Sequence, residues 1–399
     1  MQAISRTMID STIDPMTDSM IHSRVDPSCE TSASVDLMLA QLQSAIASDL
    51  APQVEAIDQQ GVYPRAFMHR VGEVGGFGQA VSQKYGGVGT GLRGAIQAIE
   101  AISQECLCTG FMSWCQVACT WYMENSDNDY LKTQILPLVA TGQALGGTGL
   151  SNPMKHFAGI EKIALIAERV AGGYKLNGML PWVSNIGAGH YFGIAAQMAD
   201  SDDYLMAIVS DELEGLTLRC NAHFIALEGS NTFSCVFRDV FVPDEWILAA
   251  PCENYVARIR PGFVLTQVGM GLGLVESCID LIERSNQRYG HVNQFLPDQA
   301  EELTAELETA RQTTYALADE LVGQEKIEQS LFKEVIKARI LGSELSLRAA
   351  QSAMLHAGAR AYLHGSKVER KLREAYFVAI VTPALKQLKK MLHDLDKIS

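Results

Sequence analysis

The stretch Leu176-Asn177-Gly178-Met179-Leu180-Pro181-Trp182-Val183-Ser184-Asn185 lies near the middle of the 399-residue chain. Gly172-Gly173 before Tyr174-Lys175-Leu176 and Asn177-Gly178 after it predict hairpin turns at both ends of that short strand. Trp182 and Ser184 are two residues apart, so on a strand they point to one face. The indole could then stack on a flat ring while the hydroxyl binds the edge of that ring. Taken alone, the pair fits a core aromatic residue followed by a turn residue at least as well.

A similar pattern of short apolar runs and turn residues extends on both sides of this stretch and predicts a β domain over residues 143–248. Short apolar runs punctuated by Gly and Asn indicate strands. These runs cover residues 163–167, 191–196, 205–209 and 236–242. A glycine-rich loop, Gly146-Gly147-Thr148-Gly149-Leu150-Ser151-Asn152-Pro153, precedes them. Its backbone N–H groups and the hydroxyls of Thr148 and Ser151 could donate hydrogen bonds to an electron-rich ring system.

Apolar residues at helical spacing flank the β domain on both sides. Residues 35–142 predict an N-terminal helical domain, and residues 249–399 predict long helices interrupted only by short breakers such as Pro297 and Pro383. Helices joined in this way must pack antiparallel as a bundle. The long stretches lie near residues 262–288, 298–324, 330–357 and 367–393. Residues 1–34 are rich in Ser, Thr, Asp and Met without a period, and they predict a flexible lead-in.

Composition excludes several classes of protein. Lys and Arg total 32 against 46 Asp and Glu, a net charge of −14, which argues against a general binder of nucleic acid or of acidic membranes. No window approaches the ~18 uninterrupted apolar residues of a membrane span. Asp10 and Asp14 lie where a signal peptide needs an apolar stretch, so we expect a cytoplasmic protein. Nine cysteines without metal-ligand spacing predict free core thiols and no metal site.

One motif resembles the fingerprint of a dinucleotide site, but the residues around it do not fit such a site. Gly89-Thr90-Gly91-Leu92-Arg93-Gly94 matches G-x-G-x-x-G, which requires a hydrophobic strand before it and an acidic residue ending a second strand. Here Gln83-Lys84-Tyr85 precedes the glycines, and Glu100 and Glu105 fall within a helical pattern. The motif therefore predicts a simple glycine-rich turn.

A set of individually weak motifs occurs in the order found in the acyl-CoA dehydrogenase superfamily, which the chain resembles from about Val35 to its end. Besides the Thr148 loop and the Trp182 strand, the motifs are Lys84-Tyr85-Gly86-Gly87-Val88-Gly89, Phe241-Val242-Pro243, Arg260-Pro261-Gly262 and Val368-Glu369-Arg370-Lys371-Leu372-Arg373-Glu374-Ala375. The resemblance implies an α+β multidomain fold with an N-terminal helical domain, a central β-barrel-like domain and a C-terminal four-helix bundle. It also implies a homotetramer or homodimer.

The resemblance implies FAD wedged between the barrel and the bundle. Carried over by position, Thr148, Ser151, Trp182 and Ser184 contact the isoalloxazine ring.

Candidate cations follow from the same comparison. Asn286 replaces the family's arginine, so Arg288, with Arg284 nearby, is the candidate for binding the FAD pyrophosphate. Against the overall negative charge, any anionic cofactor or coenzyme A must be held by local cations, and Arg260 is the candidate at the substrate; Arg360 is a further cation.

The departures from the family pattern concern the chemistry. Dehydrogenation of an acyl thioester needs a base that takes the α-proton, and a glutamate usually supplies it. That position here is Thr382, and the alternative position used by some members is Ile259. Gly149 replaces the acidic residue of the first loop, and the family's glycine-rich turn is degraded to Gly358-Ala359-Arg360-Ala361-Tyr362. The catalytic base is therefore unknown.

Three functions are compatible with this pattern. The first is an FAD-dependent oxidoreductase of fatty acid metabolism that oxidises the CH–CH bond of a coenzyme A or carrier-bound acyl thioester, with an electron-transfer flavoprotein as partner. The second is a monooxygenase that uses reduced flavin and oxygen, with a flavin reductase as partner. His356 and His364 are then candidate parts of the site, although a lone histidine near a helix end is more often a cap or solvated. The third is a catalytically silent flavin-binding homologue.

Overall fold

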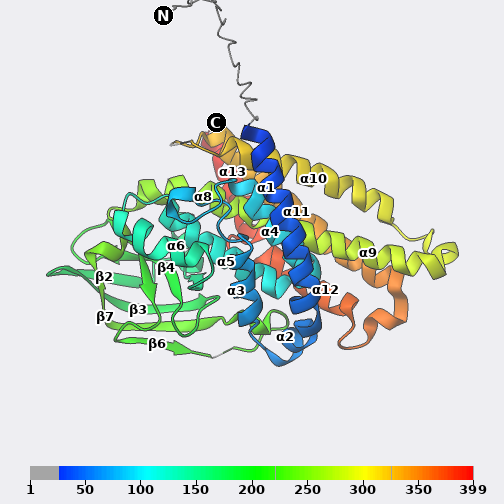
Figure 1. Cartoon of the computed structure of the whole chain (residues 1–399), viewed down its shortest axis with the longest axis horizontal. Coiled ribbons are helices and arrows are strands. Elements are labelled where there is room, and N and C mark those ends of the chain that lie inside the picture. The colour runs from blue at the N-terminus through cyan, green and yellow to red at the C-terminus, as the bar shows by residue number, and fades with distance from the viewer. Residues whose placement is uncertain (1–26, 221, 325, 399) are drawn as a thin grey trace, which may run out of the picture.

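The computed structural model describes residues 27–220, 222–324 and 326–398 (Figure 1). The predicted flexible segment lies outside the described residues as far as residue 26. From Pro27 onward the chain is helical, so the described helix begins before residue 35, where the helical spacing starts in the sequence. Helix α1 carries a stripe of buried apolar residues, Val35, Met38 and Leu42. Their packing stabilises the helix, which can therefore extend toward the N-terminus beyond the residues with apolar spacing.

The N-terminal domain is a set of helices around one buried helix. Its α-helices are α1 (Pro27–Ala45), α2 (Val54–Gln60), α3 (Arg65–Glu73), α4 (Leu92–Glu105), α5 (Leu107–Glu124) and α6 (Leu136–Ala140). Helix α5 is apolar on all sides and almost wholly buried, as expected for a helix at the centre of a large core.

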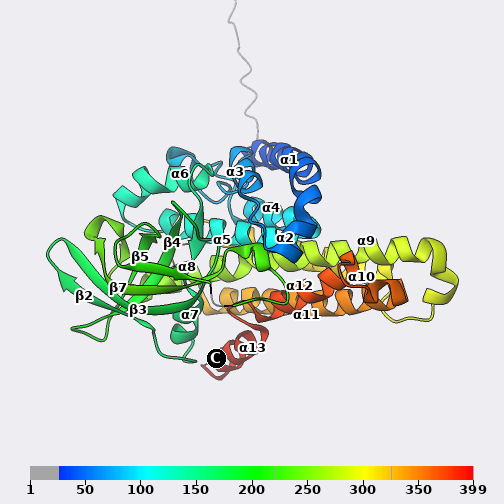
Figure 2. The ribbon, with the colours of Figure 1, turned by 90° about the horizontal axis from the view of Figure 1, so that it is seen from below.

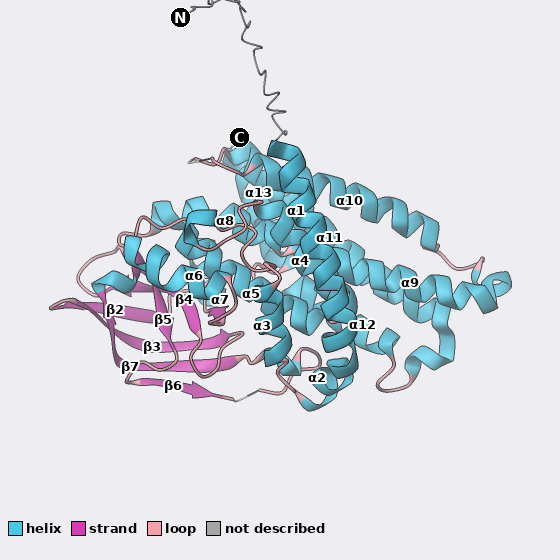
Figure 3. Cartoon of the chain, in the orientation of Figure 1, coloured by secondary structure: helices cyan, strands magenta, loops and turns pink. Residues whose placement is uncertain are grey.

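The central domain is an eight-stranded mixed sheet with its own apolar core (Figure 3). The strands are β1 (Gly146–Thr148), β2 (Leu165–Val170), β3 (Gly173–Val183), β4 (Tyr191–Met198), β5 (Tyr204–Ser210), β6 (Leu216–Arg219), β7 (Phe233–Pro243) and β8 (Ile247–Ala249), with α7 (Ser151–Phe157) after β1. Their order is β6-β7-β3-β2-β4-β5-β8, and β1 pairs with β4. The pairs β1–β4 and β2–β4 are parallel and the others antiparallel.

Of the two predicted hairpin turns, one is confirmed and one is wrong. Gly172, at a φ of 78°, makes the turn between β2 and β3. The Asn177-Gly178 pair lies inside β3, which runs on to Val183. Gly178, at a φ of 134°, follows a register shift in the pairing of β3 with β7, and the Asn177 side chain bonds to Asp239 across that pair. Gly178 therefore allows an irregularity within a long strand, and the chain does not reverse direction there.

The C-terminal domain is a bundle of long helices. They are α8 (Glu253–Thr266), α9 (Val268–Asn293), α10 (Ala300–Glu320), α11 (Gln329–Ala357), α12 (Lys367–Ile380) and α13 (Leu385–Ile398). Figure 2 shows α1 and α13 on opposite sides of the long helices α9 and α11. The helix predicted over 367–393 is split, because the Thr382-Pro383 turn separates α12 from α13. An 18-residue window within Glu253–Asn293 is apolar enough to cross a membrane, but 94% of it is buried inside the protein.

Helix α5 joins the three domains. Its Trp114 indole donates to the Thr266 hydroxyl at 3.1 Å, and its Trp121 indole donates to the Ile259 carbonyl at 3.0 Å, so two bonds fix α5 to α8. On the sheet side, the Tyr122 hydroxyl lies 2.8 Å from the Thr148 hydroxyl at the end of β1. The position of β1 relative to the bundle therefore depends on α5.

A buried histidine predicts how stability changes with pH. The Nδ1 of His190 lies 3.0 Å from the Asn185 carbonyl, so Nδ1 carries the proton, while Nε2 is buried without a partner. Burial lowers the pKa of His190 from 6.5 to about 4. Because the pKa of His190 is lower in the folded than in the unfolded protein, the unfolded state takes up a proton first as the pH falls. The free energy of unfolding is therefore highest above pH 6.5 and falls by about 3 kcal/mol as the pH approaches 4.

We expect the His190→Gln variant to lack this dependence. Urea unfolding of both proteins between pH 7 and pH 4 should show the free energy of unfolding of the wild type falling by about 3 kcal/mol more than that of the variant. Parallel curves for the two proteins would show that His190 is not held neutral by the fold.

Candidate active site

The predicted ring-binding residues all line one cavity of about 940 Å³ between the sheet and the end of α12. Thr148 is the last residue of β1 and Ser151 is the first residue of α7. Trp182 lies near the end of β3, Ser184 directly follows β3, and Thr382 lies in the turn after α12. A volume of this size is in the range of small-molecule and cofactor sites. The sequence motifs that are far apart along the chain are thus brought together at one place.

The glycine loop fits against the end of β3 because one residue lacks a side chain. A Cβ on Gly147 would lie 2.1 Å from the carbonyl oxygen of Ser184, which is impossible without backbone movement. This close approach lets Thr148 and Ser184 form a bridge, with each backbone N–H 3.4 Å from the other residue's carbonyl. Both hydroxyls are therefore held at the same wall of the cavity.

The two hydroxyls on this wall have defined partners. The Thr148 hydroxyl pairs with the Tyr122 hydroxyl at 2.8 Å, and burial raises the pKa of Tyr122, so the phenol stays protonated. The Thr232 hydroxyl donates to Ser184 Oγ at 2.8 Å, which leaves the Ser184 proton free to donate elsewhere. Trp182 is 45% exposed, so part of its ring is available for stacking.

The residue in the usual base position is hydrogen-bonded to the glycine loop. Thr382 Oγ1 lies 3.0 Å from Ser151 Oγ, so the two hydroxyls join α7 to the turn after α12. The backbone carbonyl of Thr382 accepts a hydrogen bond of 2.9 Å from the side-chain amide of Gln267. These bonds fix the turn, but neither hydroxyl can act as a base at neutral pH without help.

Aromatic side chains line much of the cavity. Six of its lining residues are aromatic: Phe111, Trp114, Trp182, Phe224, Phe263 and Phe377. Ring centroids lie 4.6 Å apart for Phe111 and Phe377 and 5.0 Å apart for Trp114 and Phe263, both in edge-to-face geometry. This packing excludes water from the end of the cavity near α5 and α8.

Glu161 is the one carboxylate among the described residues that line the cavity. Its side chain is 39% exposed, and it pairs with Lys155 at 3.4 Å and accepts from the Asn152 amide at 2.9 Å. Lys386 and Lys389 lie on the same cavity from α13. The rim thus carries more positive than negative side chains.

Four predicted site residues lie outside this cavity. Arg260 is largely buried in the bundle, with its guanidinium 4.6 Å from the ring centre of Phe332, and burial lowers its pKa. His356 is buried near the end of α11, where Nδ1 lies 2.9 Å from the Ser352 carbonyl. His364 is exposed after α11, and Arg288 is exposed near the end of α9. The roles predicted for these residues stay predictions.

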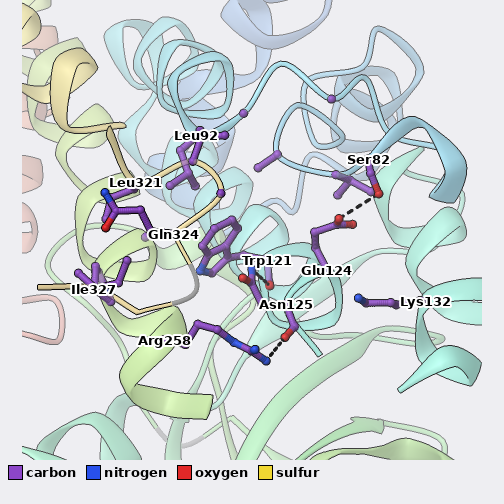
Figure 4. A pocket seen from close by; sticks show the side chains of 18 of the residues that line it. Ser82, Leu92, Trp121, Glu124, Asn125, Lys132, Arg258, Leu321, Gln324 and Ile327 are labelled. Carbon is purple, nitrogen blue, oxygen red and sulfur yellow. Dashed lines mark hydrogen bonds between the residues drawn. The ribbon is translucent and has the colours of Figure 1, made fainter. Parts of the chain in front are cut away.

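A second cavity of about 430 Å³ lies on the other side of α8 (Figure 4). Gly89 and Gly91 line it, and the short turn Gln83–Tyr85 precedes them where a dinucleotide site would need a strand. Around Trp121, the Ser82 hydroxyl donates to Glu124 at 2.9 Å and Arg258 donates to the Asn125 carbonyl. The glycine motif is therefore a turn, as the sequence predicts.

Pattern reasoning overlooked several residues that hold the cavity in shape. Gln267, Arg339, Tyr122 and Thr232 each bond directly to a lining residue or to a neighbour of one. Only their placement in space connects them, since they come from different helices and loops. Among the described residues, no group of three or more His, Cys, Asp and Glu side chains could hold a metal ion.

Comparison with known proteins agrees with this geometry. The domain described as "Acyl-CoA dehydrogenase, N-terminal domain" matches residues 32–143, and "Acyl-CoA dehydrogenase, C-terminal domain" matches residues 262–382. Together the two matches cover more than half of the chain. The chain belongs to the acyl-CoA dehydrogenase family.

Individual relatives are distant but extensive. A probable acyl-CoA dehydrogenase, YngJ, of Bacillus subtilis is 25% identical over 83% of this chain and 90% of its own length. The butyryl-CoA dehydrogenase structure from Megasphaera elsdenii has a TM-score of 0.80 at 21% identity, covering 92% of this chain and 98% of that one. A dibenzothiophene monooxygenase from Paenibacillus has a TM-score of 0.75 at 16% identity, covering 90% and 95%. The shared fold thus includes both dehydrogenases and an oxygenase.

The protein is a flavin-dependent oxidoreductase, and its cofactor is FAD. The cavity fits the flavin ring. It offers an indole face at Trp182, hydroxyls at Thr148 and Ser184, and enough volume for a fused ring system. When bound, the flavin supplies two-electron redox chemistry. The side chains described above would orient the ring and exclude water from it.

Trp182 should contribute to cofactor affinity by stacking. We expect Trp182→Ala to raise the FAD dissociation constant roughly fivefold, because a lost aromatic stack costs about 1 kcal/mol. Trp182→Phe should keep most of the affinity. Titration of the apoprotein with FAD, followed by flavin fluorescence, measures the difference.

Met179 offers a matched control for that variant. It lies on the same strand, is 48% exposed and does not line the cavity. Met179→Ala should bind FAD as the wild type does. Equal affinities for the Met179 and Trp182 alanine variants would contradict the placement of the flavin.

Proposed function

We propose that the chain is a flavin-dependent monooxygenase, an enzyme that inserts one oxygen atom of O₂ into an organic substrate and releases the other as water. The observation that carries this proposal is the hydroxyl pair of Ser151 and Thr382, which occupies the place where a dehydrogenase of this family needs a carboxylate. Reduced flavin supplies the two electrons of this reaction.

The arrangement of the cavity is poorly suited to removing a proton from carbon. Loss of a general base typically costs ~10²–10⁴ in rate. Glu161, the one lining carboxylate among the described residues, bonds to Lys155 and Asn152 and is partly exposed, so it lacks the dry setting that makes a carboxylate a strong base. Oxygen insertion needs no such base.

The aromatic lining supports a substrate with a flat apolar part. Phe111 and Phe377 meet edge to face, and Trp114 packs in the same way on Phe263. Rings of this kind bind planar apolar groups and keep the reacting centre dry, which protects reactive oxygen chemistry from water.

Dehydrogenation of an acyl thioester is the second candidate. It is favoured by the relatives described above and by others like them, which include acyl-CoA dehydrogenases that match over most of this chain. In this case Lys155, Lys386 or Lys389 at the rim could bind the anionic carrier, and Arg260 would need to reach the cavity from the bundle.

Partners and assembly follow as proposals. A monooxygenase requires a flavin reductase, whereas a dehydrogenase requires an acceptor such as an electron-transfer flavoprotein. Exposed apolar residues at the far end of the bundle, Phe295 (83%), Tyr362 (86%) and Leu363 (64%), favour a homotetramer or homodimer. A cytoplasmic location and a role in fatty acid metabolism stay predictions of the sequence.

One experiment separates the two candidates. Under anaerobic conditions a panel of acyl-CoAs should leave the oxidised flavin absorption unchanged in a monooxygenase. The flavin is then reduced chemically and air is admitted. A monooxygenase should consume oxygen and convert a suitable aromatic substrate to an oxygenated product. Flavin bleaching by an acyl-CoA would overturn the proposal in favour of dehydrogenation.

Thr382→Glu tests why dehydrogenation should be absent. A glutamate in this position could take the α-proton, so we expect the variant to be reduced by acyl-CoAs at a rate ~10²–10⁴ above the wild type. Thr382→Gln is the matched control, because it has the same size without a base, and it should stay oxidised. Stopped-flow absorbance at the flavin band makes the measurement. Equal reduction of wild type and Thr382→Glu would mean that the identity of this residue does not limit the reaction.

A further inference from the structure

Arg339 on α11 is a fully buried cation without a carboxylate partner. It has no exposed surface, and its guanidinium donates to the Gln267 side-chain oxygen at 3.0 Å, to the Val378 carbonyl at 2.6 Å and to the Ser343 hydroxyl. In the described part of the chain none of its ion-pair or hydrogen-bond partners is Asp or Glu. By contrast, Arg311 and Arg373 in the same domain each pair with at least two carboxylates.

The position of Arg339 is directly behind one wall of the larger cavity. Phe377 and residues 379–382 line that cavity, and Val378, which Arg339 binds, lies among them in the last turn of α12. Gln267 extends the contact, since its amide accepts from Arg339 at one end and donates to the Thr382 carbonyl at the other. A chain of two hydrogen bonds thus links the guanidinium to the residue at the usual base position.

A charge in this place acts on the cavity with little screening. Burial lowers the pKa of Arg339 to about 10, which still leaves the guanidinium charged at neutral pH. The carboxyl end of α12 carries about half a negative charge, so the full positive charge of Arg339 exceeds it. The protein between the Arg339 guanidinium and the cavity screens charge less than water does. The charge can therefore act on a group bound in the cavity without touching it.

We propose that Arg339 is an electrostatic positioning residue that makes the cavity favourable for negative charge on the bound flavin and its ligands. It acts through the wall formed by the end of α12 and through Gln267, and it contacts neither flavin nor substrate. The proposal rests on the cavity holding FAD and is independent of whether the enzyme oxygenates or dehydrogenates.

Arg339→Gln in the FAD-loaded protein tests the charge. Its sulfite dissociation constant should rise on the order of tenfold, because sulfite places negative charge on the flavin. An equal change in the reduction equilibrium corresponds to a midpoint potential about 30 mV lower for a two-electron couple. Both values are measured by absorbance and do not depend on turnover.

Two further variants separate charge from shape. Arg339→Lys keeps the charge and should stay within about threefold of the wild type in sulfite affinity. Arg348→Gln removes the same charge from the same helix, where the side chain is 41% exposed and pairs with Asp298 and Glu306, and it should change sulfite affinity less than twofold.

Gln267→Glu keeps the proposal testable if Arg339→Gln does not fold. A carboxylate of nearly the same size would pair with Arg339 and neutralise it, so sulfite affinity should fall in the same direction. If Arg339→Gln, or Gln267→Glu in its place, leaves both sulfite affinity and midpoint potential unchanged while FAD stays bound, the proposal is wrong. Loss of FAD binding in the wild type itself would instead contradict the cavity assignment.

Discussion

The packing of α5 between the sheet and the bundle is the constraint on which the site depends. Trp114 and Trp121 bond to α8, while Tyr122 on the same helix bonds to Thr148 at the end of β1. Because α5 is rigid and buried, these bonds hold the glycine loop at a set distance from the helices opposite it. The cavity between sheet and bundle is a consequence of that spacing, and the flavin ring fits the space it leaves.

Chemistry at this site is defined by what faces the ring. Hydroxyl groups from Thr148, Ser184, Ser151 and Thr382 line the cavity, with Thr382 in place of the usual glutamate, and aromatic rings close the far end. Behind the wall formed by the end of α12, the buried guanidinium of Arg339 donates to the Val378 carbonyl. Such a site stabilises electron-rich species and lacks a means of removing a proton from carbon.

Local pattern was sufficient for much of the fold. It also indicated that Trp182 and Ser184 share one face of a strand, and the structure places both, with Thr148, on one cavity. Their contact with the flavin ring is implied by the family resemblance and stays a prediction. The Asn177-Gly178 prediction failed because a turn-forming pair can also serve a bulge when long-range pairing with β7 favours an extended strand. Arg339 could not be found this way, since a buried arginine looks like any other residue of a helix until its partners are placed. The split between α12 and α13 depended on Pro383, which the sequence marked only as a short breaker.

The central claim is that no group in the cavity removes the α-proton of an acyl thioester. Proton exchange tests it without requiring turnover. An acyl-CoA that binds the FAD-loaded protein is incubated in D₂O without an electron acceptor, and its α-hydrogens are followed by proton NMR. The account predicts exchange no faster than in free solution. Enzyme-dependent loss of the α-proton signal would show that a working base is present and would contradict it.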